Sequence, residues 1–343
     1  MERCFSFLRN LGLLITVMFF ALWGAEYFWR WYSDWYLPPQ IMQHGNLTSM
    51  FEQDETFGYK AVPFATVQTK KTIRSQSVYD VTYHMDEFGW RNEGVFQATD
   101  NAWLFLGDSF TFGEGLMDDQ TLSMRFAEQA QGHYAAYQLA APGYGPHQLL
   151  RMLETETPRL YAGSYHTMVY QALPDHLFRF KGIYGWDSYG PEYVIKDDQA
   201  QYVGHFHSKW ASATLNVFRV FSKLAFDGDT MISSAERTWL KHRDKTITEY
   251  GAMVAGIQKL AADKYQARLV VVLWDNPPLP YLQDWSELAG KMQVELNRRG
   301  IQVIKVSKIL GSDLTPYVIA EDGHPNAAAN QKIAAALLEL SGS

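Results

Sequence analysis

Two short motifs, far apart in the sequence, contain residue types that together carry out nucleophilic catalysis in many enzymes. Ser109 follows an apolar run at 102–106 and stands in the segment Gly-Asp-Ser-Phe. His324 lies near the C-terminal end, two residues after Asp322. A serine hydroxyl becomes a strong nucleophile when a histidine takes its proton, and an aspartate can hold that histidine in the required tautomer. The three residues therefore predict acyl-transfer chemistry, provided that the fold brings them together.

A glycine-rich turn is a candidate partner for these residues. Gly143 stands in Ala-Pro-Gly-Tyr-Gly-Pro, where a strand is expected to turn into a helix that begins at Pro146. Because glycine has no Cβ atom, its backbone N–H can point at a ligand without obstruction. An ordinary strand-to-helix turn would use the same residues, and the two interpretations are compatible.

The hydrophobic pattern of the C-terminal two thirds of the chain predicts alternating strands and helices. Short apolar runs indicate strands at 102–106, 134–140, 166–173, 268–273 and 301–306. Helices are expected at 119–131, 146–156, 247–264, 285–299 and after Pro325. This alternation is typical of an α/β domain with a parallel sheet covered on both faces, in which ligands bind at the carboxyl ends of the strands. The residues just after each strand are therefore the candidates for a site.

Together these segments resemble a known enzyme family. Gly107–Phe110, Gly143 and Asp322–Asn326 are similar to the first, second and last sequence blocks of the SGNH/GDSL hydrolases, in the family's order. The resemblance covers residues 101–343 and implies a three-layer α/β/α, flavodoxin-like domain, with no cofactor expected. It also implies that Ser109 is the nucleophile, that His324 is the base, and that the N–H groups of Ser109 and Gly143 belong to an oxyanion hole.

The chain departs from the family's pattern at two places. The third block of the family offers an Asn that donates to the oxyanion, whereas this chain has Asp175 there, followed by His176. An ionised carboxylate would repel an oxyanion, and His176 is the expected substitute because a histidine carries an N–H. Loss of one such donor typically lowers the rate by ~10²–10³.

Many members also place Asp three residues before His, where this chain has Glu321. We favour Asp322, because some polysaccharide O-acetyltransferases of the wider group resemble this closer spacing.

The N-terminal region predicts a membrane anchor. Residues 10–25 carry no charge, Arg3 and Arg9 precede them, and a Trp- and Tyr-rich segment follows, as at a membrane interface. A cleaved signal peptide has a similar apolar length, but Trp23 would stand where the cleavage site needs a small side chain. We therefore expect one uncleaved transmembrane helix within 1–36, in a bacterial inner membrane, with the rest of the chain facing the periplasm.

Two further segments complete the predicted organisation. Residues 37–98 are expected to form a connector and a small β extension. The SGNH-like domain at 99–343 contains an aromatic-rich insertion at about 181–245, for which we expect loops and one helix above the carboxyl edge of the sheet.

Aromatic side chains of this insertion are candidate substrate-binding residues. The side chains that could stack on sugar rings or cover an acyl chain, or else form the core of a packed subdomain, are Trp186, Tyr189, Tyr193, Tyr202, His205, Phe206, His207 and Trp210, and we select Tyr202 and Trp210. His205 and His207 have the spacing of a metal pair, but two histidines without further ligands do not make a site, and no metal is expected.

Composition limits the functions that remain. The chain has 343 residues, a net charge of −7 and 47% hydrophobic residues, which excludes a disordered protein and gives no reason to bind nucleic acid. Its single cysteine, Cys4, allows no intramolecular disulfide. The sequence therefore predicts an anchored serine esterase or O-acyltransferase that acts on ester groups, expected to be O-acetyl groups, of a cell-surface glycan. A membrane acyltransferase or a polymer-synthesis complex is the expected partner. The alternative is a non-catalytic assembly or binding component of a surface-polymer system that retains the fold.

Overall fold

The computed structural model describes residues 9–10, 12–14, 16–25, 50–73, 76–92, 101–182, 185–187, 189–206, 242–276 and 285–342. The chain forms two compact units, one of residues 1–40 with 207–243 and one of residues 41–206 with 244–343. The predicted sheet and the predicted Ser-His-Asp residues all belong to the second unit.

The first unit contains the predicted anchor. Its residues 16–25 are helical and expose the large apolar side chains of Phe19, Phe20 and Trp23. Within the residues that the structure describes, none of the helices is both long enough and apolar enough to span a lipid bilayer. Most of the rest of the predicted anchor at 1–36 lies outside the described residues.

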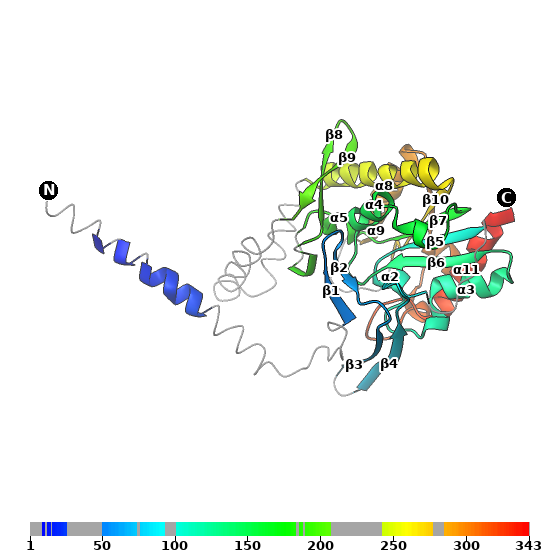
Figure 1. Ribbon diagram of the computed structural model, residues 1–343, viewed down its shortest axis with the longest axis horizontal. Coiled ribbons are helices and arrows are strands. Elements are labelled where there is room, and N and C mark those ends of the chain that lie inside the picture. The colour runs from blue at the N-terminus through cyan, green and yellow to red at the C-terminus, as the bar shows by residue number, and fades with distance from the viewer. Residues whose placement is uncertain are drawn as a thin grey trace. The chain divides into compact units, whose positions relative to one another are not determined.

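The second unit is built on a five-stranded parallel sheet. Its strands are β5 (Ala102–Gly107), β6 (Ala135–Ala140), β7 (Thr167–Ala172), β10 (Arg268–Leu273) and β11 (Gln302–Lys305). They lie in the order β11-β10-β7-β5-β6 (Figure 1). If the five strands are numbered along the chain and the sheet is followed from the β6 edge, their order is 2-1-3-4-5. This is the flavodoxin-like arrangement of a doubly wound fold. The prediction of an α/β fold with a parallel sheet is confirmed, because continuous apolar runs form strands that are buried on both faces.

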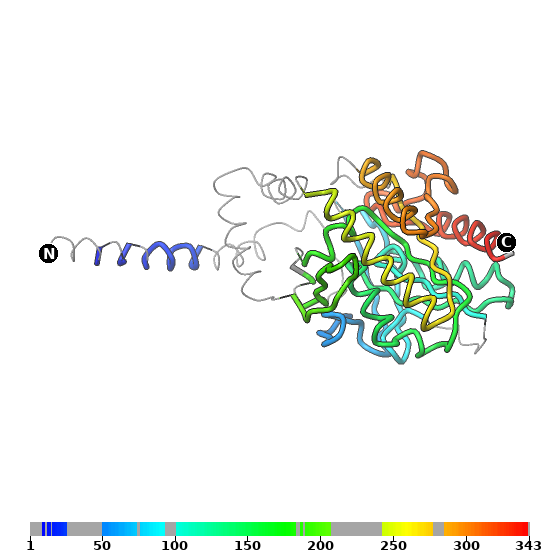
Figure 2. The backbone as a smooth tube through the Cα atoms, turned by 90° about the horizontal axis from the view of Figure 1, so that it is seen from above, coloured from blue at the N-terminus to red at the C-terminus, as the bar shows by residue number. Residues whose placement is uncertain are grey.

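Helices cover both faces of this sheet, as the ribbon in Figure 1 shows. On one face, α3 (Leu122–Ala130) and α11 (Ala327–Glu339) pack against Trp103 and Phe105 of β5. On the other lie α4 (Pro146–Glu154), α8 (Arg243–Tyr265) and α9 (Trp285–Arg298). In the view of Figure 2 the long helix α8 lies over the strands. The predicted helix boundaries differ from the observed ones by a few residues, mainly at the ends.

The shorter helical segments lie between these elements. They are the α-helices α2 (Ser109–Phe112), α5 (His176–Arg179) and α10 (Val306–Leu310), and the 3₁₀ turns at Asp118–Gln120, Thr157–Leu160, Gly185–Asp187, Thr315–Tyr317 and Leu340–Gly342. Two of them, α2 and α5, directly follow the carboxyl ends of β5 and β7 and contribute to the site.

Two antiparallel hairpins precede the sheet in the sequence. The hairpin of β3 (Thr66–Ile73) and β4 (Gln76–His84) matches the predicted β extension. The hairpin of β1 (Phe51–Asp54) and β2 (Gly58–Ala61) was not expected, because its first strand falls in a polar stretch that reads as a connector. The Asp54 carboxylate accepts hydrogen bonds from the N–H groups of Thr56 and Phe57, which closes the turn.

The described part of the insertion contains a hairpin, which the sequence analysis did not expect. Strands β8 (Pro191–Lys196) and β9 (Gln199–His205) pair antiparallel. The two residues between them, Asp197 and Asp198, have φ angles of 50° and 59°. Two consecutive left-handed residues give a turn whose twist matches that of paired strands, and aspartate tolerates this conformation. Residues 207–241 of the insertion lie outside the described part of the chain.

Candidate active site

The nucleophile candidate stands where β5 ends. Asp108 caps the one-turn helix α2, and its carboxylate accepts a hydrogen bond of 3.0 Å from the N–H of Phe110. Gly107 leaves room for this turn, because a Cβ atom there would lie 2.1 Å from Oγ1 of Thr111. Ser109 is therefore held as the first residue of α2, at the carboxyl edge of the sheet, and its side chain is largely buried.

The structure brings the three residues of the predicted Ser-His-Asp set together. Nε2 of His324 lies 2.8 Å from Oγ of Ser109. Nδ1 of the same ring lies 2.5 Å from Oδ1 of Asp322, which also accepts the backbone N–H of His324 at 3.0 Å. Glu321, the other carboxylate considered, is exposed and has a left-handed backbone with a φ of 60°. The hydrogen-bonded chain thus runs through Asp322.

The loop that carries His324 is fixed by the start of α11. Asn326 caps this helix by accepting the N–H of Ala329 at 3.1 Å, and its own side chain donates to the carbonyl of Pro316 at 2.9 Å. The backbone N–H of Ile319 donates to the carbonyl of His324. The Asp-Gly-His-Pro-Asn segment therefore forms a closed turn whose histidine faces the serine.

A lysine from the β extension binds the second carboxylate oxygen of Asp322. Nζ of Lys71, in β3, lies 2.5 Å from Oδ2 of Asp322, and both side chains are buried. Burial alone would raise the pKa of Asp322, but His324 and Lys71 outweigh it and hold that pKa well below its usual range. No local feature of the sequence links Lys71 to Asp322, because 251 residues separate them.

The imidazole of His324 lies between two carboxylates. Oε2 of Glu114 is 3.7 Å from Nε2, the nitrogen that faces Ser109. Burial lowers the pKa of His324, but the negative charges of Glu114 and Asp322 outweigh burial and raise this pKa to about 9. At neutral pH the imidazole is therefore mostly protonated before substrate binds. Glu114 was not among the predicted site residues, although it lies only five positions after Ser109.

Gly143, the predicted second oxyanion donor, adopts a conformation that favours glycine. Its φ angle is 87°, and a Cβ atom there would lie 2.7 Å from both Nε1 of Trp186 and the hydroxyl of Tyr59. The Tyr59 hydroxyl donates to the carbonyl of Pro142 at 2.6 Å, and Nε1 of Trp186 donates to the carbonyl of Gly143 at 3.4 Å. These contacts fix the peptide that carries the Gly143 N–H.

His176 does not fit the role of substitute donor. It is fully buried, with Nε2 at 3.2 Å from Oδ2 of Asp108 and Nδ1 at 2.6 Å from the hydroxyl of Tyr170. Both ring nitrogens are thus engaged inside the protein. Burial lowers the pKa of His176, although the nearby Asp108 carboxylate acts in the opposite direction. We therefore do not retain His176 in the oxyanion hole.

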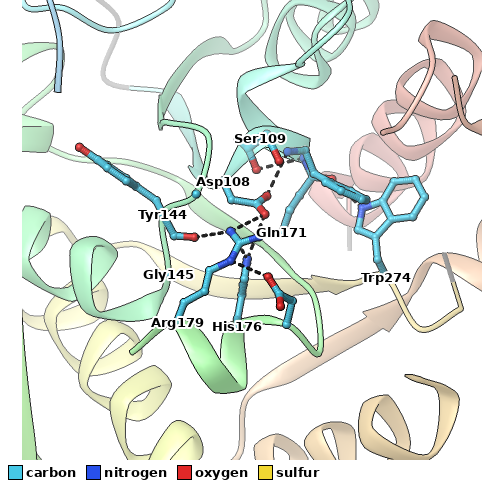
Figure 3. Close-up of polar contacts among 12 residues, drawn as sticks. Asp108, Ser109, Tyr144, Gly145, Gln171, His176, Arg179 and Trp274 are labelled. Carbon is cyan, nitrogen blue, oxygen red and sulfur yellow. Dashed lines mark hydrogen bonds and ion pairs between the residues drawn. The ribbon is translucent and has the colours of Figure 1, made fainter. Parts of the chain in front are cut away.

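An arginine that the sequence analysis did not single out organises the floor of the site (Figure 3). Nη1 of Arg179 donates to Oδ2 of Asp108 at 2.8 Å and to the carbonyl of Tyr144 at 2.7 Å. Its Nε donates to Oδ2 of Asp175 at 2.8 Å. Asp175, which was expected to repel an oxyanion, is therefore paired with a cation. Burial raises the pKa of Asp108, but Arg179 and His176 outweigh burial and keep that carboxyl ionised.

A second buried chain of hydrogen bonds ties α2 to the strands beneath it, as Figure 3 shows. Nε2 of Gln171 donates to Oγ1 of Thr111 at 3.1 Å, and Nε1 of Trp274 donates to Oε1 of Gln171 at 2.9 Å. The ends of β5, β7 and β10 are thereby joined below Ser109. Such satisfied buried networks rigidify a site.

The aromatic residues predicted to bind substrate differ in where the structure places them. One face of the Tyr202 ring is covered by the guanidinium group of Arg151 at 3.8 Å, and its hydroxyl lies 3.0 Å from Nε2 of His205. Trp210 and His207 lie outside the described residues. Trp186 remains 54% exposed while its Nε1 donates to the carbonyl of Gly143, so among the described residues of the insertion it is an aromatic side chain that lies beside the site.

One group of side chains has the residue types of a metal site. Glu114, Asp322 and His324 offer ligand atoms within 4.8 Å of one another. A metal ion there would have to compete with the Lys71 ammonium group for Asp322 and with Ser109 for His324. The arrangement fits proton transfer better than metal binding, and we assign it no metal.

Comparison with known proteins gives distant structural similarities only. No protein-family model matches the chain, and no curated protein is similar to it in sequence. Among solved structures, it is similar to a G-D-S-L family lipolytic protein from Veillonella parvula, with 12% identity, a TM-score of 0.42, and coverage of 70% of this chain and 97% of that one. It is also similar to Est24, a carbohydrate acetylesterase from Sinorhizobium meliloti, with 11% identity, a TM-score of 0.39, and coverage of 71% and 98%.

A third similar structure is that of TesA, with 11% identity, a TM-score of 0.42, and coverage of 69% of this chain and 96% of that one. Likeness at this level says nothing of activity. The function has to be argued from the arrangement of Ser109, His324 and Asp322.

Proposed function

We propose that the chain is a serine ester hydrolase or acyltransferase in which Ser109 is the nucleophile. The observation that carries the proposal is the continuous set of contacts from Oγ of Ser109 to Nε2 of His324, and from Nδ1 to Asp322. An aspartate on Nδ1 fixes the tautomer that leaves Nε2 free to accept the serine proton. Three side chains from two distant segments meet in the order that this chemistry requires.

The reaction follows from these contacts. Oγ of Ser109 attacks the carbonyl carbon of an ester while its proton moves to Nε2 of His324, and the carbonyl oxygen becomes an oxyanion. The N–H groups of Ser109 and Gly143 are the proposed donors to this oxyanion. When the intermediate collapses, the bond to the leaving alcohol breaks, and His324 returns the proton to that alcohol. Water or a sugar hydroxyl then attacks the acyl-serine while His324 takes its proton. The bond between the acyl carbon and Oγ breaks, and His324 returns the proton to Ser109.

The finer assignment concerns substrate and place. An ester of a surface glycan, such as an O-acetyl group, is supported by the exposed indole of Trp186 beside Gly143, because aromatic faces stack on sugar rings. A membrane anchor with a periplasmic site is supported by the uncharged run at 10–25 and by the exposed apolar side chains of helical residues 16–25. A membrane acyltransferase or a polymer-synthesis complex would then be the partner that supplies or receives acyl groups.

A fluorophosphonate probe tests the nucleophile directly. Oγ of an activated serine attacks the phosphorus of such a probe and fluoride leaves, so full-length protein in detergent should become labelled. Ser109→Ala should abolish labelling and the turnover of an activated acetyl ester, with little change in melting temperature. His324→Ala should lose a comparable share of activity, because residues that act as one unit are not additive.

Serine residues elsewhere in the chain provide the matched control. Ser123 is also buried and lies at the start of α3, where its hydroxyl lies 3.3 Å from that of Thr121 and no histidine takes its proton among the described contacts. Ser123→Ala should leave labelling unchanged. Equal labelling of wild type and Ser109→Ala, or none of either, would overturn the proposal and favour the second candidate. That candidate is a non-catalytic binding component, which the replacement of the third-block Asn by Asp175 favours.

A further inference from the structure

Glu114 approaches the same imidazole nitrogen as the proposed nucleophile. Its Oε2 lies 3.7 Å from Nε2 of His324, whereas Asp322 binds the opposite nitrogen. The position of Glu114 relative to Ser109 is fixed, because its backbone N–H donates to the carbonyl of Ser109 at 3.0 Å. Gly113, with a φ angle of 79°, turns the chain at the end of α2 and directs Glu114 back toward the site. The carboxylate is thus held one turn beyond the nucleophile.

The β extension holds Glu114 from the other side. The hydroxyl of Tyr79, in β4, makes a hydrogen bond with the Glu114 carboxylate. In the same strand, the hydroxyl of Tyr83 accepts the backbone N–H of Gly115 at 2.8 Å. Burial, followed by the charge of Glu114, raises the pKa of Tyr79, so the phenol remains a donor. Glu114 is therefore a buried acidic side chain with an ordered hydrogen-bond partner.

The charged groups around His324 come from four segments. Asp322 lies in its own loop, Glu114 follows α2, Asp108 precedes α2, and Lys71 in β3 binds Asp322. The ring of Phe110 packs beside the imidazole, with 5.3 Å between the ring centroids. Because Lys71 compensates the charge of Asp322, the additional negative charge of Glu114 favours an imidazolium at His324. Two carboxylates, one on each side of the ring, are more than a Ser-His-Asp arrangement requires.

We propose that Glu114 is a positioning residue that stabilises the protonated form of His324. The inference rests on the proposed function, and it gives Glu114 two consequences in that reaction. It lowers the energy of the imidazolium that forms when Ser109 loses its proton, which favours attack. It also keeps the His324 imidazole of the free enzyme protonated at neutral pH. His324 can therefore act as a base only at alkaline pH or when a bound substrate lowers its pKa.

The test is an NMR titration of the His324 ring in the full-length protein, with the signal assigned from its absence in His324→Asn. Glu114→Gln keeps the shape of the side chain and removes its charge, and should lower the titration midpoint by about one pH unit or more. Glu114→Asp keeps the charge but withdraws the carboxylate by one methylene, and should lower the midpoint less. Glu321→Gln, which removes an exposed carboxylate three residues from His324, is the matched control and should leave it unchanged.

The titration separates this inference from the proposed function. A His324 midpoint that is the same in wild type, Glu114→Gln and Glu114→Asp would overturn the role of Glu114, even in a fully active enzyme. If Glu114→Gln does not fold, an unchanged midpoint in Glu114→Asp has the same meaning. A lowered midpoint in a protein that no fluorophosphonate labels would instead support the effect of Glu114 on His324 and overturn the esterase proposal. In an active enzyme, the lower limb of the pH profile of kcat/KM should move with the midpoint.

Discussion

Lys71 and Asp322 form a buried ion pair across 251 residues, with Nζ 2.5 Å from Oδ2. The pair joins the β3–β4 hairpin to the loop that carries His324. Because Asp322 uses its other oxygen for Nδ1 of His324, one carboxylate connects the hairpin to the proposed base. The β extension is therefore part of the site rather than an appendage to the α/β domain.

Removal of Lys71 should affect stability as well as activity. Lys71→Met leaves Asp322 buried without its cation, and loss of one partner of a buried pair typically costs roughly 3–5 kcal/mol. Urea unfolding of the full-length protein measures this change. Lys70→Met is the matched control, because Lys70 is 53% exposed in its ion pair with Asp80, and exposed pairs contribute about 1 kcal/mol or less. Similar losses for both variants would contradict a special role of Lys71.

The two carboxylates before His324 should differ sharply in their effect on turnover. Asp322→Asn should lower kcat by up to ~10⁴, as for the corresponding change in serine proteases, because the amide no longer fixes the required tautomer. Glu321→Gln should change kcat little, since Glu321 is exposed. Steady-state kinetics with an activated acetyl ester give both values. A larger loss for Glu321→Gln would move the orienting role to that residue.

The activity should be alkaline. Only neutral His324 can accept the serine proton, and its pKa is raised to about 9, so kcat/KM should rise with pH and level off above about pH 9. The profile is measured with a substrate whose own hydrolysis can be subtracted at each pH. A profile that is already flat at pH 7 would contradict the raised pKa.

The contribution of His324 to the stability of the fold should fall as the pH rises, whereas its contribution to activity should increase. Folding raises the pKa of His324 from an unfolded value of about 6.5 to about 9, so the folded state binds the proton more tightly. Its contribution to stability is complete below about pH 6.5 and is lost as the pH rises to about 9. The difference in unfolding free energy between wild type and His324→Asn should shrink over this range. A constant difference would show that folding does not raise this pKa.

Trp186 should distinguish polymeric from small substrates. Trp186→Ala should raise KM for a glycan ester by roughly fivefold, equivalent to about 1 kcal/mol of aromatic stacking, and leave a small acetyl ester nearly unaffected. Trp186→Phe keeps a ring and should retain most of the affinity. Equal effects on the two substrates would remove the support that Trp186 gives to a glycan ester.

The proposed anchor is tested in membranes. The protein in membranes should retain residues 10–25, should stay in the membrane fraction after a carbonate wash, and should report an outside location when fused to a reporter after Tyr36. Val17→Arg introduces a charge into the apolar run, which costs roughly 2.5–3.5 kcal/mol at the centre of a membrane helix, and should reduce retention. A soluble form that starts near Glu26 would show a cleaved signal peptide instead.

The sequence by itself determined the order of the parallel strands and of the main helices of the α/β domain, and the identity of Ser109, Gly143, Asp322 and His324 as candidates. These signals are local. Continuous apolar runs specify strands buried on both faces, Pro146 and Asn326 begin helices, and glycines open the turns after the strands. Since the strands of a parallel sheet end at one edge, local signals were enough to predict that residues after them would lie close together.

Only the tertiary structure decided which charges surround these residues. Three side chains contact the site or its floor although the local sequence around them does not predict these contacts: Lys71, Tyr79 and Arg179. His176 carries the N–H that the oxyanion hole requires, but the approach of Asp108 and Tyr170 turns both of its nitrogens inward. Hydrophobic periodicity specifies which face of an element is buried, whereas the pKa of a buried group depends on charges brought within a few ångströms by distant parts of the chain.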